Sequence, residues 1–201
     1  MIIRHLMTGI LALITTTSHA YTVSEGSGIF TDFSNDSVMP TYTGLLDIGS
    51  NSISGSTSFI GSAADTDYFS FAVQSGSKLT SLVTDYVSDD YFHVSVGLYE
   101  IQAADSLSFL GGFRLGDAYF DVVNPVLSSG TNILTYLGFD SLESSEYAIG
   151  LAGFTKRGGY DVNLDYTFTA NTSPVPLPST AWLFVVGLAG LLKTAWKHKS
   201  K

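Results

Sequence analysis

Apolar and polar residues alternate over short runs in the middle of the chain, and clusters of Gly, Asn, Asp and Ser separate these runs. A period of two residues is typical of strands that bury one face, and no long stretch has the spacing of an amphipathic helix. The clearest predicted strands are 68–73, 79–86, 92–99, 133–137, 146–152 and 160–168, with weaker candidates at 41–47, 52–60, 107–113 and 119–123. Residues 21–170 are therefore expected to form an all-β domain, an antiparallel β-sandwich of about 8–10 strands.

The same alternation predicts which side chains form the core. Along 160–168 one face is apolar and the other is polar, and along 68–73 the aromatic residues Phe69 and Phe71 share a face with Val73. The apolar face of the later run holds Tyr160, Val162, Leu164, Tyr166 and Phe168. The opposite faces of the two runs hold Asp161, Asn163 and Asp165, and Ser70 and Ala72.

Residues 1–20 have the order of a secretory signal peptide. Arg4 gives a positive start, an apolar run covers 6–14, and the small residues Ser18 and Ala20 precede the expected cleavage point. The apolar run is too short to cross a membrane as a helix. We expect export through the Sec translocon and cleavage by signal peptidase after Ala20.

Residues 179–196 are expected to form a transmembrane helix. The segment is uncharged up to Leu192 and covers about 27 Å at about 1.5 Å per residue, with Trp182 and Trp196 near opposite interfaces. The basic tail 197–201 is expected to stay in the cytoplasm, which places the acidic domain outside the inner membrane. The residues expected to anchor the helix are Trp182, Leu183, Phe184, Leu191, Leu192, Lys193 and Lys197.

A Pro-rich linker, 171–178, joins the domain to this helix. Its residues Val175, Pro176, Leu177 and Pro178, followed by the apolar helix and the basic end, resemble the PEP-CTERM sorting signal of Gram-negative bacteria. The resemblance implies that an exosortase-type enzyme recognises and removes the tail, and that the mature protein joins an extracellular polysaccharide or biofilm matrix. Leu177 stands where many members have Glu, and the basic end has spaced Lys residues instead of a compact Arg run.

The composition excludes several classes of function. The chain has 201 residues, 18 Asp and Glu against 9 Lys and Arg, and a formal net charge of −9. All the acidic residues lie between Glu25 and Asp165, so the domain is more acidic than the chain as a whole. Such a domain is not expected to bind nucleic acid, because that affinity comes mostly from Lys and Arg on phosphates. The absence of Cys excludes disulfides and thiolate metal sites.

A second resemblance lies within the domain. Asp65, Asp67 and the aromatic run 68–71 resemble the opening Asp-x-Asp-aromatic-Phe-x-Phe motif of bacterial pre-peptidase C-terminal domains, and 147–149 with 159–164 resemble their closing motif. This resemblance implies a jelly-roll-like sandwich of the kind that accompanies secreted enzymes or binds matrix. Asp67 and the two residues after it also partly match the Phe-x-Asp-x-Phe signature of small β-rich PEP-CTERM proteins.

No catalytic residues are expected. His93 is the one His outside the two end segments, and the pattern of its run places it opposite Phe92 and Val94 as an exposed or half-buried side chain. The chain has no Gly-x-Ser-x-Gly motif, no His-x-x-x-His pair for zinc, and no clustering of Glu and Trp for glycoside cleavage. Most of the carboxylates are therefore expected to solubilise turns and sheet edges.

Asp65 and Asp67 are the candidate metal ligands. They lie in an expected turn, as do Asp89 and Asp90 further along the chain, and Ca²⁺ prefers hard oxygen ligands of this kind. The spacing does not continue as an EF-hand loop. Ca²⁺ is the one cofactor that the sequence suggests.

These features together predict a non-enzymatic secreted or cell-surface protein of the extracellular polysaccharide or biofilm matrix. Two alternatives stay open: a carbohydrate-binding module, in which aromatic side chains such as Tyr86, Tyr91 and Tyr99 stack on sugars, and a small secreted hydrolase of unrecognised type. The expected partners are the Sec translocon, signal peptidase, the membrane, an exosortase-type enzyme and extracellular polysaccharide.

Overall fold

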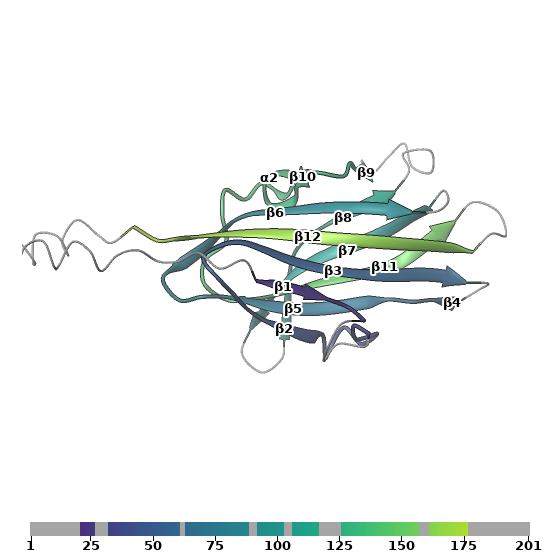
Figure 1. The fold of residues 1–201 in the computed structure, drawn as a ribbon, viewed down its shortest axis with the longest axis horizontal. Helices are drawn as coiled ribbons and strands as arrows, with labels where there is room; N and C mark the ends of the chain where they lie inside the picture. The colour runs from purple at the N-terminus through teal and green to yellow at the C-terminus, as the bar shows by residue number, and fades with distance from the viewer. Residues whose placement is uncertain are drawn as a thin grey trace, which may run out of the picture.

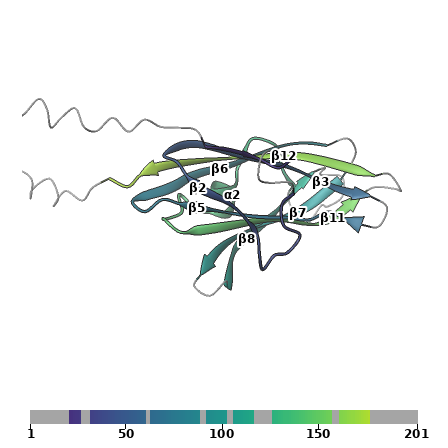
Figure 2. The ribbon, with the colours of Figure 1, turned by 60° about the horizontal axis from the view of Figure 1, so that its bottom comes forward.

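The computed structural model describes residues 21–26, 32–60, 63–88, 92–102, 106–116, 126–156 and 161–176, without the side chains of 153–156. These residues form two six-stranded sheets that face each other as a β-sandwich (Figures 1 and 2). Sheet A has the order β1 (Thr22–Ser24), β3 (Gly49–Ile60), β12 (Val162–Pro174), β6 (Ser77–Ser88), β10 (Thr131–Asn132), with β4 (Ala63–Ala64) on β3. Sheet B has the order β2 (Thr41–Leu46), β5 (Asp67–Val73), β11 (Glu146–Lys156), β7 (Phe92–Gln102), β8 (Ser106–Gly116), β9 (Val126–Leu127).

The interior strands of both sheets are antiparallel, as the alternation predicted. Parallel pairing occurs at three sheet edges, where β1 joins β3, β2 joins β5 and β9 joins β8. The described residues form twelve strands instead of the predicted 8–10, because β1, β4, β9 and β10 have only two or three residues each. Strands this short carry no measurable alternation in a sequence. The predicted strand at 119–123 lies outside the described residues.

The core is built from the predicted faces of β5 and β12. Val162, Leu164 and Phe168 of β12 are fully or almost fully buried, and the ring of Phe168 lies 5.6 Å from the ring of Phe69 across the sandwich. Ser70, predicted on the opposite face of β5, is also buried. Its hydroxyl donates to Glu146 Oε1 of β11 over 3.0 Å, and its backbone carbonyl accepts a hydrogen bond of 2.8 Å from the Thr43 hydroxyl of the neighbouring edge strand β2.

The prediction of a strand at 133–137 is wrong: Ile133–Leu137 is the short helix α2. The side-chain oxygen of Asn132 accepts a hydrogen bond from the Leu134 backbone N–H, and Gly138 ends the helix in the left-handed region with φ 86°. Asn before an apolar run and Gly after it are helix-capping signals. A five-residue apolar run cannot distinguish a strand from a buried helical turn by periodicity, so the caps decided the structure.

Both described ends of the domain lie at the same end of the sandwich. Thr22 at the start of β1 pairs with Ser52 of β3, and Ser52 pairs with Thr169 near the end of β12. In Figure 1, β12 runs out at the left end of the molecule. The end of β3 and the short strand β4 lie at the opposite end.

None of the helices among the described residues is long and apolar enough to span a membrane. Several predictions concern residues outside the described ranges. These are the signal peptide 1–20, the helix 179–196, the tail 197–201, and the residues Leu177, Pro178, Trp182, Leu183, Phe184, Leu191, Leu192, Lys193 and Lys197.

Candidate functional site

Asp67, one of the two predicted metal ligands, points into the sandwich. It is the first residue of β5, and the alternation of the strand puts its side chain on the same face as Phe69 and Phe71. Its exposed fraction is 0%. A carboxylate at such a position must replace its lost hydration with hydrogen bonds, a proton or a cation.

One oxygen of Asp67 has a hydrogen-bond partner and the other does not. The Tyr166 hydroxyl of β12 donates to Asp67 Oδ2 over 2.8 Å, whereas Oδ1 is buried with no partner among the described residues. The ring of Tyr166 lies between the two sheets, stacked on Phe69 with 6.3 Å between centroids. Tyr166 thus links Asp67 of sheet B to β12 of sheet A.

The electrostatic environment favours the neutral form of Asp67. The pKa of Asp67 is raised to about 8, mainly by burial of the carboxyl; the Tyr166 hydrogen bond lowers this pKa, and the negative charges of Glu25, Asp65 and Asp32 raise it. The same surroundings raise the pKa of Tyr166 well above its ordinary value, first through burial and then through the charge of Asp67.

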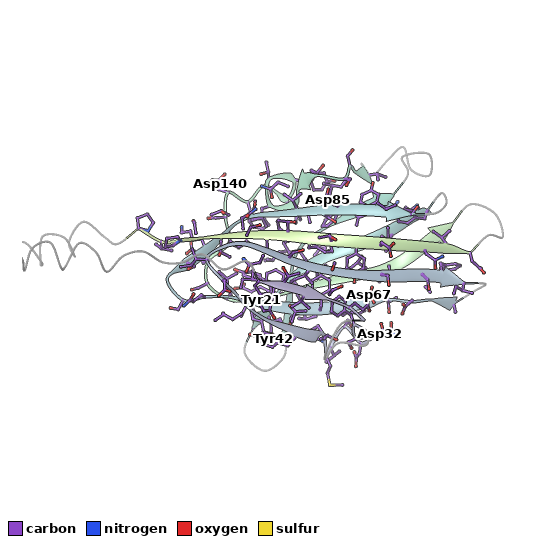
Figure 3. The ribbon with its side chains drawn as sticks, in the orientation of Figure 1. Tyr21, Asp32, Tyr42, Asp67, Asp85 and Asp140 are labelled. Carbon is purple, nitrogen blue, oxygen red and sulfur yellow. The ribbon has the colours of Figure 1, made fainter. Side chains whose placement is uncertain are left out.

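Three carboxylates converge at this point: Glu25, Asp32 and Asp67, here called the acidic cluster. One carboxylate oxygen from each lies within 4.8 Å of the other two. Glu25 follows the edge strand β1, Asp32 lies just before the buried Phe33, and Asp67 opens β5. Figure 3 shows Asp32 and Asp67 at the same edge of the sandwich.

The backbone holds Glu25 in a fixed position. Its Oε1 accepts a hydrogen bond of 2.8 Å from the Phe33 N–H, and its Oε2 accepts one of 2.6 Å from the Ser56 N–H. Gly55 leaves the space that the cluster needs, because a Cβ there would lie 2.5 Å from Tyr166 Oη and 2.8 Å from Glu25 Oε2. The phenol and the carboxylate converge over this glycine of β3.

Asp65, the other predicted ligand, lies beside the acidic cluster without belonging to it. Its backbone N–H donates to the Ser58 carbonyl over 2.8 Å, and its own carbonyl accepts from the Thr57 hydroxyl. Partial burial, together with the charge of Asp32, raises the pKa of Asp65. The sequence therefore indicated Asp67 and its neighbour but missed Glu25 and Asp32, and Asp89 and Asp90 lie outside the described residues.

A second feature is a trough on the outer face of sheet B, a cavity of about 350 Å³. Its floor follows a row of paired residues across four strands, from Tyr68 of β5 through Gly150 of β11 and Gly97 of β7 to Gly112 of β8. Glycines leave the backbone open for large neighbours. The side chains that line the trough include Tyr68, Ser95, Tyr99, Phe109, Arg114 and Tyr136.

Aromatic rings lie over the glycine floor of the trough. A Cβ at Gly150 would come within 2.4 Å of the Tyr68 ring, and one at Gly97 would come within 2.5 Å of the Tyr99 hydroxyl. The rings of Tyr99 and Phe109 pack with 5.4 Å between centroids, and Phe109 is 63% exposed. The trough thus offers aromatic surface with polar groups at its side.

The other residues considered from the sequence lie apart from the trough and the acidic cluster. The Tyr86 hydroxyl donates to the carbonyls of Gly116 and Leu127, and its ring packs against Phe92. Tyr86 therefore has a structural role, joining β6 to residues of sheet B. Tyr91 lies outside the described residues. His93 is buried, with an exposed fraction of 8%, instead of exposed or half-buried as predicted.

Comparison of the chain with family models, with curated proteins and with solved structures finds no match.

Proposed function

We propose that this chain is an exported, non-enzymatic protein of the cell surface or of the extracellular polysaccharide matrix. The signal peptide 1–20 directs export through the Sec translocon, and the helix 179–196 holds the protein in the inner membrane with the domain outside the cytoplasm. An exosortase-type enzyme then recognises the motif at 175–178. The order of these segments in the sequence is the main support.

The observation that supports this proposal is the position at which the chain leaves the sandwich, directly before the predicted sorting motif. Val175 makes the last backbone hydrogen bond of the described residues, its N–H donating to the Gly76 carbonyl over 2.7 Å, and Pro176 follows directly. The sorting motif therefore begins where the domain ends. Because proline restricts the residue before it to extended conformations, this stretch suits an enzyme that grips the backbone.

The other end of the domain agrees with processing after Ala20. The Ser52 N–H donates to the Tyr21 carbonyl over 2.8 Å, and the Tyr21 hydroxyl donates to the Thr43 carbonyl of sheet B. Cleavage before Tyr21 would leave these contacts intact. A membrane anchor at the C-terminal end would present the β3–β4 end of the sandwich to the outside (Figure 1).

We infer further that the sandwich is jelly-roll-like. Its longer strands and β10 follow the orders β3-β12-β6-β10 and β5-β11-β7-β8, and these eight strands alternate between the sheets along the chain except where β8 follows β7 within sheet B. Two facing four-stranded sheets wound in this way are the arrangement of a jelly roll. This topology supports the resemblance to pre-peptidase C-terminal domains at the level of architecture.

The sorting step is tested by the double substitution Pro176→Ala and Pro178→Ala. The variant is expected to accumulate in the membrane fraction while wild type is released to the surface or medium. Pro40→Ala, a proline change outside the motif, serves as the control and should leave release unchanged. Equal release of the double variant and wild type would refute sorting through this motif.

Carbohydrate binding is a second candidate function, and the trough on sheet B favours it. Pyranose rings stack their C–H faces on aromatic side chains, and polar groups beside the rings can bond sugar hydroxyls. Of the predicted sugar-stacking residues that the structure describes, Tyr99 lines the trough and Tyr86 does not. Binding of this kind would also explain retention in a polysaccharide matrix.

Affinity electrophoresis through gels that contain neutral or acidic polysaccharides tests this function. Phe109→Ala is expected to restore the free mobility of the protein, because it removes an exposed ring from the trough. Tyr42→Ala is the matched control, since Tyr42 is 51% exposed on β2, away from the trough. Equal retardation of both variants would assign any binding to another surface.

A further inference from the structure

We propose that the acidic cluster, Glu25, Asp32 and Asp67, binds one Ca²⁺ ion that ties the edge strand β1 and the segment at Asp32 to β5 of the other sheet. The site differs from the one expected from sequence, since two of its three carboxylates come from outside the Asp65–Asp67 turn. The proposal is independent of the sorting signal and of the trough.

The spacing of the oxygens fits this ion. Two oxygens bound to one Ca²⁺ at about 2.4 Å each lie at most about 4.8 Å apart. The cluster supplies one oxygen from each carboxylate within that span of 4.8 Å. Mg²⁺ usually takes only one or two protein carboxylates and keeps several waters, so a site with three protein carboxylates favours the more adaptable Ca²⁺.

The second observation is the unpartnered oxygen of Asp67. Asp67 Oδ1 is buried without a hydrogen-bond partner among the described residues, on a side chain that is 0% exposed. A buried polar atom without a partner costs free energy, and a buried anion costs more. A cation bound by this carboxylate would remove both costs, while Oδ2 keeps its hydrogen bond from Tyr166.

The charges around the cluster point the same way. Asp65 adds a fourth carboxylate nearby, and its charge acts on Asp67 together with those of Glu25 and Asp32. Among the described side chains, Lys78 pairs with Glu143 at 2.8 Å and Arg114 lines the trough, so both lie elsewhere. The donors in the cluster are hard oxygens, which suit Ca²⁺ and not softer transition metals.

The cluster is also positioned to receive an ion. Glu25 is held by two backbone N–H groups, so its carboxylate is already oriented. Asp32 is exposed, which leaves an approach from solvent. β1 pairs with β3 over only three residues, and an ion shared between Glu25 and Asp67 would fasten this short strand to the opposite sheet.

Titration of the metal-free, full-length chain in detergent with CaCl₂ tests the proposal. Calorimetry should show one site per chain, and the Tm should rise with Ca²⁺. Asp32→Asn is expected to weaken binding at least tenfold. Asp140→Asn, which removes one exposed charge far from the cluster (Figure 3), should bind as wild type does.

MgCl₂ at equal concentration should give a smaller shift of the Tm. Either of two results would overturn the proposal: no heat and no shift of the Tm with CaCl₂, or the same Ca²⁺ affinity in Asp32→Asn as in wild type. A protein whose Tm responds to pH at this site but not to Ca²⁺ would show that a proton neutralises the cluster instead.

Discussion

At the scale of single residues, Asp67 is the carboxylate on an otherwise apolar inner face of β5. Phe69, Phe71 and Val73 continue that face and are buried. The Tyr166 hydroxyl compensates for only part of the hydration that Asp67 loses. The stability of the domain should therefore depend on whether Asp67 carries a proton.

In the presence of a chelator, the free energy of unfolding of wild type is expected to fall as the pH rises from about 4 to about 8. The pKa of Asp67 is raised from 3.8 to about 8 in the folded protein, mainly by burial. The folded state therefore keeps a proton that the unfolded state has already lost, and the stability from this proton disappears as the pH approaches the folded pKa. At about 1.4 kcal/mol per pKa unit, this shift corresponds to a loss of up to about 6 kcal/mol over this range.

Urea denaturation at several pH values measures this effect, with Asp67→Asn as the comparison. The amide is uncharged throughout and can still accept the Tyr166 hydrogen bond, so its pH profile should lack this part of the slope. Tyr166, Glu25, Asp32 and Asp65 face Asp67 and stay present in both proteins. Identical slopes for the two proteins would contradict the raised pKa of Asp67.

The sequence could indicate Asp67 but not the rest of the acidic cluster. The alternation of 68–73, extended back by one residue, already puts Asp67 on the face of Phe69 and Phe71. Glu25 and Asp32 have no such signal, because they lie in short irregular stretches about 35–40 residues earlier in the chain. Only the pairing of β1 with β3 and the position of Asp32 beside β5 bring them together.

At the scale of elements, α2 shows how two capping residues override an apolar run that also suits a strand. Asn132 Oδ1 accepts hydrogen bonds of 3.1 Å from the N–H groups of both Leu134 and Leu82. Gly138 donates its N–H to the last turn and has φ 86°. One side chain therefore caps the helix and also accepts a hydrogen bond from a backbone N–H of β6.

Asn132→Ala is expected to lower the free energy of unfolding by about 1–2 kcal/mol, because it leaves two backbone N–H groups without this acceptor. Gly138→Ala is expected to cost about 1 kcal/mol, since a Cβ there meets no atom within 4 Å and only the left-handed backbone opposes it. Chemical denaturation measures both. Asn132→Asp keeps the acceptor and should lose less; a loss equal to that of Asn132→Ala would rule out the capping role.

The trough shows what the sequence pattern of separate strands cannot predict, which is the register between them. Gly97, Gly112 and Gly150 were visible as glycines within predicted strands. Their alignment into one row depends on the registers of β11, β7 and β8, and each register could shift by one residue without altering the alternation within its own strand. The face of each strand was therefore predictable, whereas the trough across the strands was not.

At the scale of the whole molecule, the antiparallel interior strands could be predicted from the sequence pattern, whereas the pairing of the edge strands could not. Long alternating strands such as β5 and β12 determine the two facing sheets, and their sequence predicted them. The short edge strands β1, β2 and β9 pair in parallel, and their positions depend on the loops that lead to them. The result places both described ends of the domain at one end of the sandwich, opposite the end of β3 and β4.

Removal of residues 177–201 is therefore expected to detach the protein from the membrane without unfolding the domain. Val175 donates its N–H to the Gly76 carbonyl, and β12 ends at Pro174, so a chain that stops at Pro176 keeps the described contacts of the sandwich. Expressed with its signal peptide, this truncated chain should appear in the soluble exported fraction, with a Tm within about 2 °C of the full-length protein.

A chain that stops at Ala170 lacks the last four residues of β12, which pair with the first residues of β6, so it should be strongly destabilised. Cell fractionation and thermal denaturation measure the two effects separately. Membrane retention of the chain that stops at Pro176 would show that the anchor does not lie in 179–196.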